Sequence, residues 1–101
     1  MNYYLKWSER AVESLELIEK FISQVSVSKA ERVTGDIVVF AKKLELFPLM
    51  GKLDCALGDD VRKLIKDDYF IVYRVQDNMI YIIDVLCSKQ DFIFIYGGAQ
   101  S

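Results

Sequence analysis

The sequence predicts a small α+β domain in which a strand and a helix hairpin precede an antiparallel three-stranded meander. Two patterns carry this prediction. In the first half of the chain, apolar residues recur every three to four positions, which is typical of amphipathic helices. In the second half, three apolar runs are separated by short acidic turns, which is typical of hairpin strands. A length of 101 residues favours a single core, so we expect one domain over residues 1–101.

A short strand and two helices are expected first. Residues 3–7 alternate apolar and polar side chains, which predicts an opening strand, and Ser8 is the expected N-cap of the first helix. Ser28 and Glu31 have the capping-box spacing, so a second helix should start directly after Ser28, and Pro48 should end it. The expected apolar stripes are Val12, Leu15, Ile18 and Ile22 in the first helix, and Val33, Ile37, Phe40 and Leu44 in the second.

The meander should follow a connecting loop over residues 48–60. Its predicted strands cover residues 61–66, 69–76 and 79–86, joined by two-residue turns at Asp67-Asp68 and Asp77-Asn78. Counting outward from these turns places Arg62 opposite Tyr73, and Tyr73 opposite Ile82. The same count puts Asp84 on the face of Tyr73 and Val85 on the other face. Both faces are mostly apolar, so the helices should cover one face and something else should partly cover the other.

The closing run, residues 92–96, contains five apolar residues in a row. A free strand edge of this composition would aggregate. We therefore expect the run to form a further C-terminal strand, to be buried against the sheet, or to be held by another chain.

Composition restricts the chemistry. Thirteen Lys and Arg residues against fifteen Asp and Glu residues give a net charge of −2, which disfavours strong direct binding of nucleic acid. The chain has no histidine and only two cysteines, so we expect neither a zinc site nor another metal or cofactor. The sequence shows neither a membrane-spanning stretch nor a signal-peptide pattern, so we expect a cytoplasmic protein without a membrane partner.

Five short sequence motifs occur in one characteristic order: Trp7-Ser8, Phe47-Pro48-Leu49-Met50-Gly51, Val61-Arg62-Lys63-Leu64, residues 69–75 and residues 80–85. In this order the chain resembles the RelE/ParE superfamily of bacterial toxins, and most closely the ParE branch. The resemblance implies a β-α-α-β-β-β toxin of a type II, plasmid-stabilisation toxin–antitoxin system. A cognate antitoxin that wraps the toxin is the partner it implies, in a hetero-oligomer or beside a homo-oligomer.

The resemblance also implies two mechanisms. RelE-like members cut messenger RNA on the ribosome, whereas ParE-like members are associated with inhibition of DNA gyrase. RNA cleavage needs a base, an acid and cations that stabilise the phosphorane. Arg62, Arg74 and Lys89 are the only catalytic candidates, and Phe94 stands near the place of an expected Tyr, so the catalytic set is incomplete. We therefore predict a toxin that binds and inhibits DNA gyrase. A ribosome-dependent endoribonuclease and a non-toxic interaction module remain the alternatives.

The candidates for binding the target or partner combine cations with aromatic residues: Arg62, Lys63, Arg74, Tyr81, Phe92, Phe94 and Tyr96. Each cation also has a structural interpretation. Lys63 can extend its aliphatic stem over apolar neighbours. Arg74 lies mid-strand beside Tyr81, where a buried guanidinium would need a partner. Arg62 shares a face with Asp84 but can reach it only through its long side chain. Trp7 and residues 47–51 are expected to be core and turn, and not contact surface.

Overall fold

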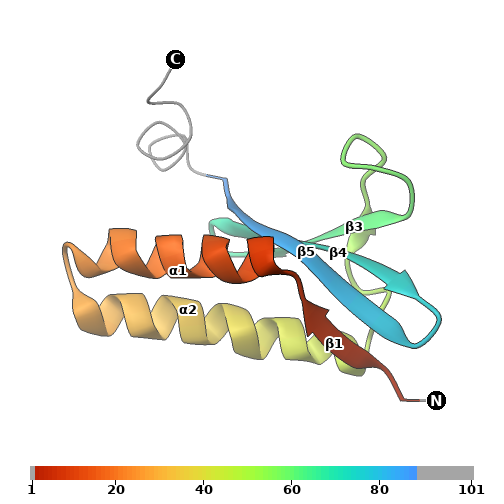
Figure 1. Cartoon of the computed structure of the whole chain (residues 1–101), viewed down its shortest axis with the longest axis horizontal. Coiled ribbons are helices and arrows are strands. Elements are labelled where there is room, and N and C mark those ends of the chain that lie inside the picture. The colour runs from red at the N-terminus through yellow and green to blue at the C-terminus, as the bar shows by residue number, and fades with distance from the viewer. Residues whose placement is uncertain (1, 89–101) are drawn as a thin grey trace.

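The computed structural model describes residues 2–88 and contains a five-stranded sheet with a helix hairpin packed on one face (Figure 1). The elements are β1 (Tyr4–Trp7), α1 (Glu9–Ser23), α2 (Val27–Lys42), the 3-10 helix η1 (Lys43–Glu45), β2 (Lys52–Leu53), β3 (Val61–Lys66), β4 (Tyr69–Gln76) and β5 (Met79–Cys87). The predicted α+β order of strand, helix hairpin and meander is confirmed.

The sheet is wider than the three-stranded meander that the sequence predicts. Its strand order is β1-β5-β4-β3-β2, with β1 parallel to β5 and the other pairs antiparallel. In Figure 1, β1 leads from the N-terminus into the start of α1, and it pairs with β5. The short strand β2 lies in the segment expected to be only a loop, where Lys52 and Leu53 pair with β3. The predicted further strand over residues 92–96 lies outside the described residues.

One helix start is confirmed and the other is corrected. Ser8 caps α1, because its Oγ accepts a hydrogen bond from the Ala11 amide at 2.9 Å. The N-cap of α2 is Ser26 and not Ser28, and its Oγ accepts from the Lys29 amide at 3.2 Å. The link between the helices is shorter than expected, so the first available hydroxyl becomes the cap. The predicted end of α2 at Pro48 is also wrong, because the helix ends at Lys42 and η1 follows it before Pro48.

Both predicted hairpin turns are confirmed. Asp67 and Asp77 adopt positive φ angles of 55° and 56°, which two-residue hairpin loops require. Arg62 lies opposite Tyr73 and Tyr73 opposite Ile82, as counted from the turns. From Val72 toward Tyr69, the register predicted for β4 and β5 is wrong.

A β-bulge causes that failure. The pairing shifts between Val72 and Tyr73, so that Val72 lies opposite Asp84 and Ile71 lies opposite Val85. Val85 therefore joins the core on the helix side, where the sequence had placed Asp84.

The core lies between the helix hairpin and the sheet, which identifies the covered face. Trp7 packs against this core while remaining partly exposed, so its expected place in the core is confirmed. The largest fully buried side chains are Ile18, Ile37 and Leu44 from the helical segment and Ile71, Tyr73, Ile80 and Ile82 from the sheet.

Candidate functional site

Two predicted binding residues are neighbours on adjacent strands. Arg74 of β4 pairs with Tyr81 of β5, and Tyr81 pairs in turn with Lys6 of β1. All three side chains are exposed. The Arg74 guanidinium donates to the carbonyl of Asp59 at 3.2 Å, so it holds the acidic loop over residues 54–60 to the sheet.

Lys63 holds the same acidic loop from β3. Its Nζ lies 3.3 Å from a carboxylate oxygen of Asp54 and 4.6 Å from the centroid of the Phe70 ring. The ammonium group is thus engaged by a carboxylate and an aromatic face. These contacts favour the structural interpretation of Lys63.

Arg62 does not join these cations. Its Nη1 donates to the carbonyl of Gly51 at 2.8 Å and to that of Leu49 at 3.4 Å. Asp84, the distant partner considered from the sequence, has other partners. It accepts hydrogen bonds from Arg10 Nε at 3.0 Å, from Ser14 Oγ at 2.5 Å and from the Val85 amide at 2.8 Å.

The segment that Arg62 contacts is an exposed apolar loop. We use this name for residues 46–50, which connect η1 to β2. The sequence prediction that residues 47–51 form a turn is confirmed by a hydrogen bond from the Met50 amide to the Phe47 carbonyl at 3.1 Å. The prediction that they belong to the core is wrong for the apolar loop, since Leu46, Phe47 and Leu49 are 75%, 61% and 62% exposed.

Tyr73 holds this loop against the sheet. Its ring is fully buried, and its hydroxyl donates to the Pro48 carbonyl and accepts from the Gly51 amide, both at 2.8 Å. A Cβ atom on Gly51 would lie 2.8 Å from the Tyr73 ring and hydroxyl, so only glycine fits this approach without displacement. Together, Tyr73 and Arg62 tie the backbone of the loop to the sheet.

Burial raises the pKa of Tyr73, against smaller lowering effects of the Gly51 hydrogen bond and the Arg62 charge. The unfolded chain therefore loses this proton first, near pH 10. We expect the contribution of Tyr73 to stability to be complete below pH 10 and to decline as the pH rises toward its folded pKa. Urea unfolding at pH 8 and pH 10.5 should show a smaller alkaline loss for Tyr73→Phe than for the unchanged chain. An equal loss in both would contradict this assignment.

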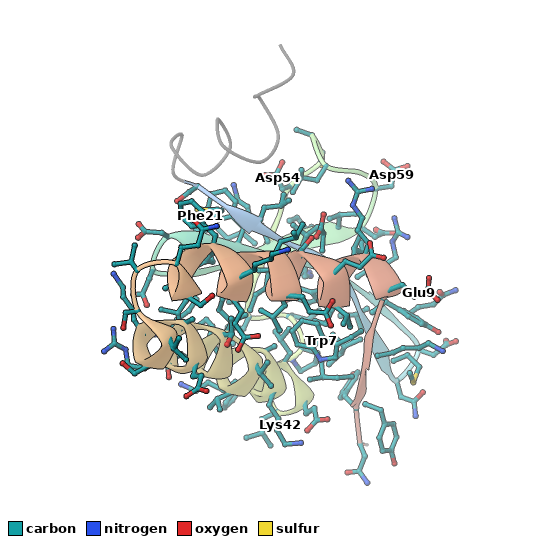
Figure 2. The ribbon with its side chains drawn as sticks, turned by 60° about the vertical axis from the view of Figure 1, so that its left-hand side comes forward. Trp7, Glu9, Phe21, Lys42, Asp54 and Asp59 are labelled. Atoms are coloured by element: carbon teal, nitrogen blue, oxygen red, sulfur yellow. The ribbon has the colours of Figure 1, made fainter. Side chains whose placement is uncertain are left out.

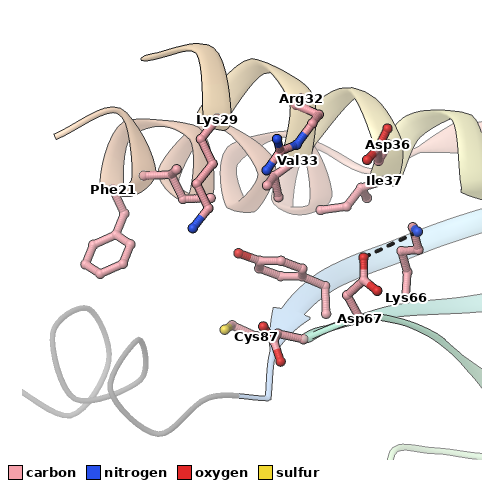
Figure 3. A pocket seen from close by; sticks show the side chains of 12 residues that line it. Phe21, Lys29, Arg32, Val33, Asp36, Ile37, Lys66, Asp67 and Cys87 are labelled. Atoms are coloured by element: carbon pink, nitrogen blue, oxygen red, sulfur yellow. Dashed lines mark ion pairs between the residues drawn. The ribbon is translucent and has the colours of Figure 1, made fainter. Parts of the chain in front are cut away.

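A cavity of about 760 Å³ lies between the linked end of the helix hairpin, where α1 ends and α2 begins, and the β3–β4 turn (Figure 3). In Figure 3, Lys29 and Arg32 reach into it from α2, and the Lys66–Asp67 ion pair lies on the sheet side. Burial, followed by the charges of Cys87 and Asp68, raises the pKa of Tyr69 in its wall. Basic and acidic side chains balance in this lining, so it does not favour a phosphate: Lys29, Arg32 and Lys66 face Asp36, Asp67 and Asp68.

The structure therefore gathers only part of the predicted set. Arg74 and Tyr81 lie side by side, Lys63 shares the acidic loop with Arg74, and Arg62 serves a different segment. The other candidates, Lys89, Phe92, Phe94 and Tyr96, lie outside the described residues.

Tyr73 and Gly51 were not among the site residues predicted from the sequence. Tyr73 was placed correctly on its face, but an apolar strand pattern does not show that a hydroxyl at its end meets a loop. A glycine directly after an apolar run that includes proline was the one available signal.

Within residues 2–88, no helix is long and apolar enough to cross a membrane.

Comparison with known proteins gives one family and several similar structures. A family profile described as the ParE toxin of the type II toxin–antitoxin system parDE matches residues 5–92. The chain is 23% identical to a chain of the chromosomal ParDE system from P. aeruginosa, with a TM-score of 0.75 over 86% of this chain and 97% of that one. A search of curated proteins gave no match.

Two further solved structures share the fold. The chain is 22% identical to a chain of the toxin–antitoxin complex RelBE2 from Mycobacterium tuberculosis, with a TM-score of 0.66 over 86% of this chain and 99% of that one. It is 19% identical to a mutant of the E. coli toxin RelE in the free state, with a TM-score of 0.55 over 99% of this chain and 98% of that one.

Proposed function

Because the chain belongs to the ParE toxin family of type II toxin–antitoxin systems, we propose that it inhibits DNA gyrase by binding it and that a cognate antitoxin neutralises it. The observation that carries this proposal is the engagement of its cations. Arg62, Lys63 and Arg74 each bind a carbonyl or carboxylate oxygen of this chain, and these contacts hold loops in place. Inhibition by a complementary surface needs no reacting group, and this arrangement is compatible with it.

The same observation disfavours cleavage of RNA. A phosphorane requires cations that converge on it, beside groups that transfer protons. Among the described residues, Arg62 points to the apolar loop while Lys63 and Arg74 hold the acidic loop. The Tyr73 hydroxyl has its own backbone partners. The net charge of −2 also opposes docking to ribosomal phosphates.

An antitoxin has an apolar surface available on this chain. A shallow groove of about 530 Å³ runs between α1 and α2, and Val12, Val38 and Val39 in it are 43%, 42% and 65% exposed. An amphipathic or extended antitoxin segment would bury these side chains. DNA gyrase and such an antitoxin are both encountered in the cytoplasm, where we place the toxin.

The test uses the purified chain, with and without its cognate antitoxin. We expect the chain alone to inhibit DNA supercoiling by gyrase and an equimolar amount of antitoxin to restore it. Translating ribosomes given the same protein should keep their messenger intact.

Other results would replace this proposal. Codon-specific cuts in messenger would establish the RelE-type endoribonuclease. Normal growth of a bacterium after induction, together with unaffected supercoiling, would establish a non-toxic interaction module.

A further inference from the structure

The apolar loop carries three apolar side chains that are more than 60% exposed, Leu46, Phe47 and Leu49, and the proposed function has not used it. We propose that this loop is the element by which the toxin docks to its protein target, inserting Phe47 and Leu49 into an apolar pocket with an acidic rim. The proposal rests on the proposed function in one respect: it takes the chain to act by binding a target.

The loop is held in one shape before any partner arrives. The Phe47 amide donates to the Lys43 carbonyl at 3.0 Å, which continues the last helical turn into the loop. Further along, Pro48 and Gly51 are bonded to the Tyr73 hydroxyl, and Arg62 binds two more carbonyls. A surface that is already ordered loses less entropy on binding, so its exposed apolar area contributes more to affinity.

The bonds also explain why the side chains point outward. All of the contacts named above are made by backbone atoms of the loop or of Gly51 directly after it, which draws the backbone onto the sheet. The apolar side chains of Leu46, Phe47 and Leu49 are left on the outside. Isolated exposed leucines are common in proteins, but a contiguous exposed group is typical of interaction sites.

Charge indicates the kind of pocket that would receive the loop. Residues 42–53 contain three lysines and one glutamate, a net charge of 3 − 1 = +2 in a chain whose total is −2. Lys42 pairs with Glu45 at 3.3 Å, which leaves Lys43 and Lys52 beside the loop. Figure 2 shows Lys42 on the opposite side of the view from Asp54 and Asp59, so the Lys42 end of this positive region lies away from the acidic loop, whereas Lys52 stands two residues before Asp54. A partner surface with carboxylates around an apolar pocket complements it.

A second copy of the chain is a poorer partner. Two apolar loops in contact about a two-fold axis would bring their lysines together, and like charges oppose that contact. The groove between α1 and α2 is apolar with glutamates at its border, but docking the loop there would join copies head to tail, as a ring or an open filament, and not as a two-fold dimer.

The experiment replaces the two exposed apolar side chains on either side of Pro48. Phe47→Ser/Leu49→Ser should raise the concentration needed to inhibit gyrase supercoiling at least tenfold and abolish growth arrest on induction. The midpoint temperature of thermal unfolding should change little, because both side chains are exposed. If the double variant unfolds, Leu46→Ser alone, at the most exposed position of the loop, should still weaken inhibition severalfold.

The matched control lies at the other end of the helix hairpin. Val25→Ser/Val27→Ser changes two apolar side chains that are 89% and 62% exposed, and it should inhibit as the unchanged chain does. Full inhibition by the folded loop variant would overturn the proposal. Loss of antitoxin binding with toxicity kept would also overturn it, as would a shift from oligomer to monomer as the only change.

Failure of the gyrase assignment gives a different pattern. If the unchanged chain arrests growth without affecting supercoiling, the target is another protein, and loss of arrest in the loop variant alone still supports the docking role. If the unchanged chain inhibits gyrase and the loop variant inhibits it equally, only the docking proposal fails.

Discussion

Gly51→Ala is expected to lower the free energy of unfolding by about 3 kcal/mol and to reduce toxicity. The added Cβ would lie 2.8 Å from the buried Tyr73 side chain and 3.0 Å from the backbone carbonyl of Lys63. Neither neighbour can yield easily, because Tyr73 is fully buried and Lys63 belongs to a central part of the sheet. The loop must therefore move, and the bonds from Tyr73 and Arg62 are strained or lost. Chemical denaturation measures the stability, and induced expression measures the toxicity.

Gly35→Ala is the matched control for this substitution. Gly35 lies in α2 with no atom within 4 Å of an added Cβ. Alanine is a better helix former than glycine, so this change should raise the free energy of unfolding by up to about 1 kcal/mol. If Gly51→Ala were as harmless as Gly35→Ala, the tight contact with Tyr73 would not constrain the loop.

Asp84→Ala is expected to cost about 2–4 kcal/mol of folding free energy. Asp84 is 7% exposed, and its carboxylate joins β5 to α1 through Ser14 and Arg10 while also accepting from the Val85 amide. Its removal leaves the hydroxyl and the amide without their acceptor beside a small cavity. Thermal or urea unfolding of the purified variant measures this loss.

Arg10→Ala separates the ion pair from the buried hydrogen bonds. The Arg10 side chain is 79% exposed, so its charge is well solvated when the pair breaks. We expect a cost below about 1 kcal/mol. A cost as large as that of Asp84→Ala would mean that the surface ion pair, and not the buried bonds, holds α1 to the bulge.

Local patterns predicted the elements of this fold well. The turns at Asp67-Asp68 and Asp77-Asn78 follow from residue types that tolerate positive φ, and the Ser8 cap follows from a hydroxyl before a helical pattern. The second helix was misplaced because two serines two residues apart both had capping potential. Which of them caps depends on the length of the link, and Ser26 is reached first.

The candidate site was less predictable from sequence. Arg62 was identified as a functional cation, but its direction could not be known, because the carbonyls that it binds belong to a loop 11 and 13 residues earlier in the chain. The bulge between Val72 and Tyr73 likewise could not be predicted from the sequence, because Ile83 and its neighbours have the pattern of an uninterrupted strand.

By itself, the sequence determined the family resemblance, the order of helices and strands, and the register next to each turn, because these depend on residues close together in the chain. Tertiary structure decided which sheet face the helices cover and that residues 46–50 are displayed instead of buried. The reason is that Tyr73 reaches Gly51 and Pro48 across 22 and 25 residues of sequence, and its buried hydroxyl must find a partner there. Satisfying that hydroxyl draws the loop backbone inward and leaves its apolar side chains on the surface.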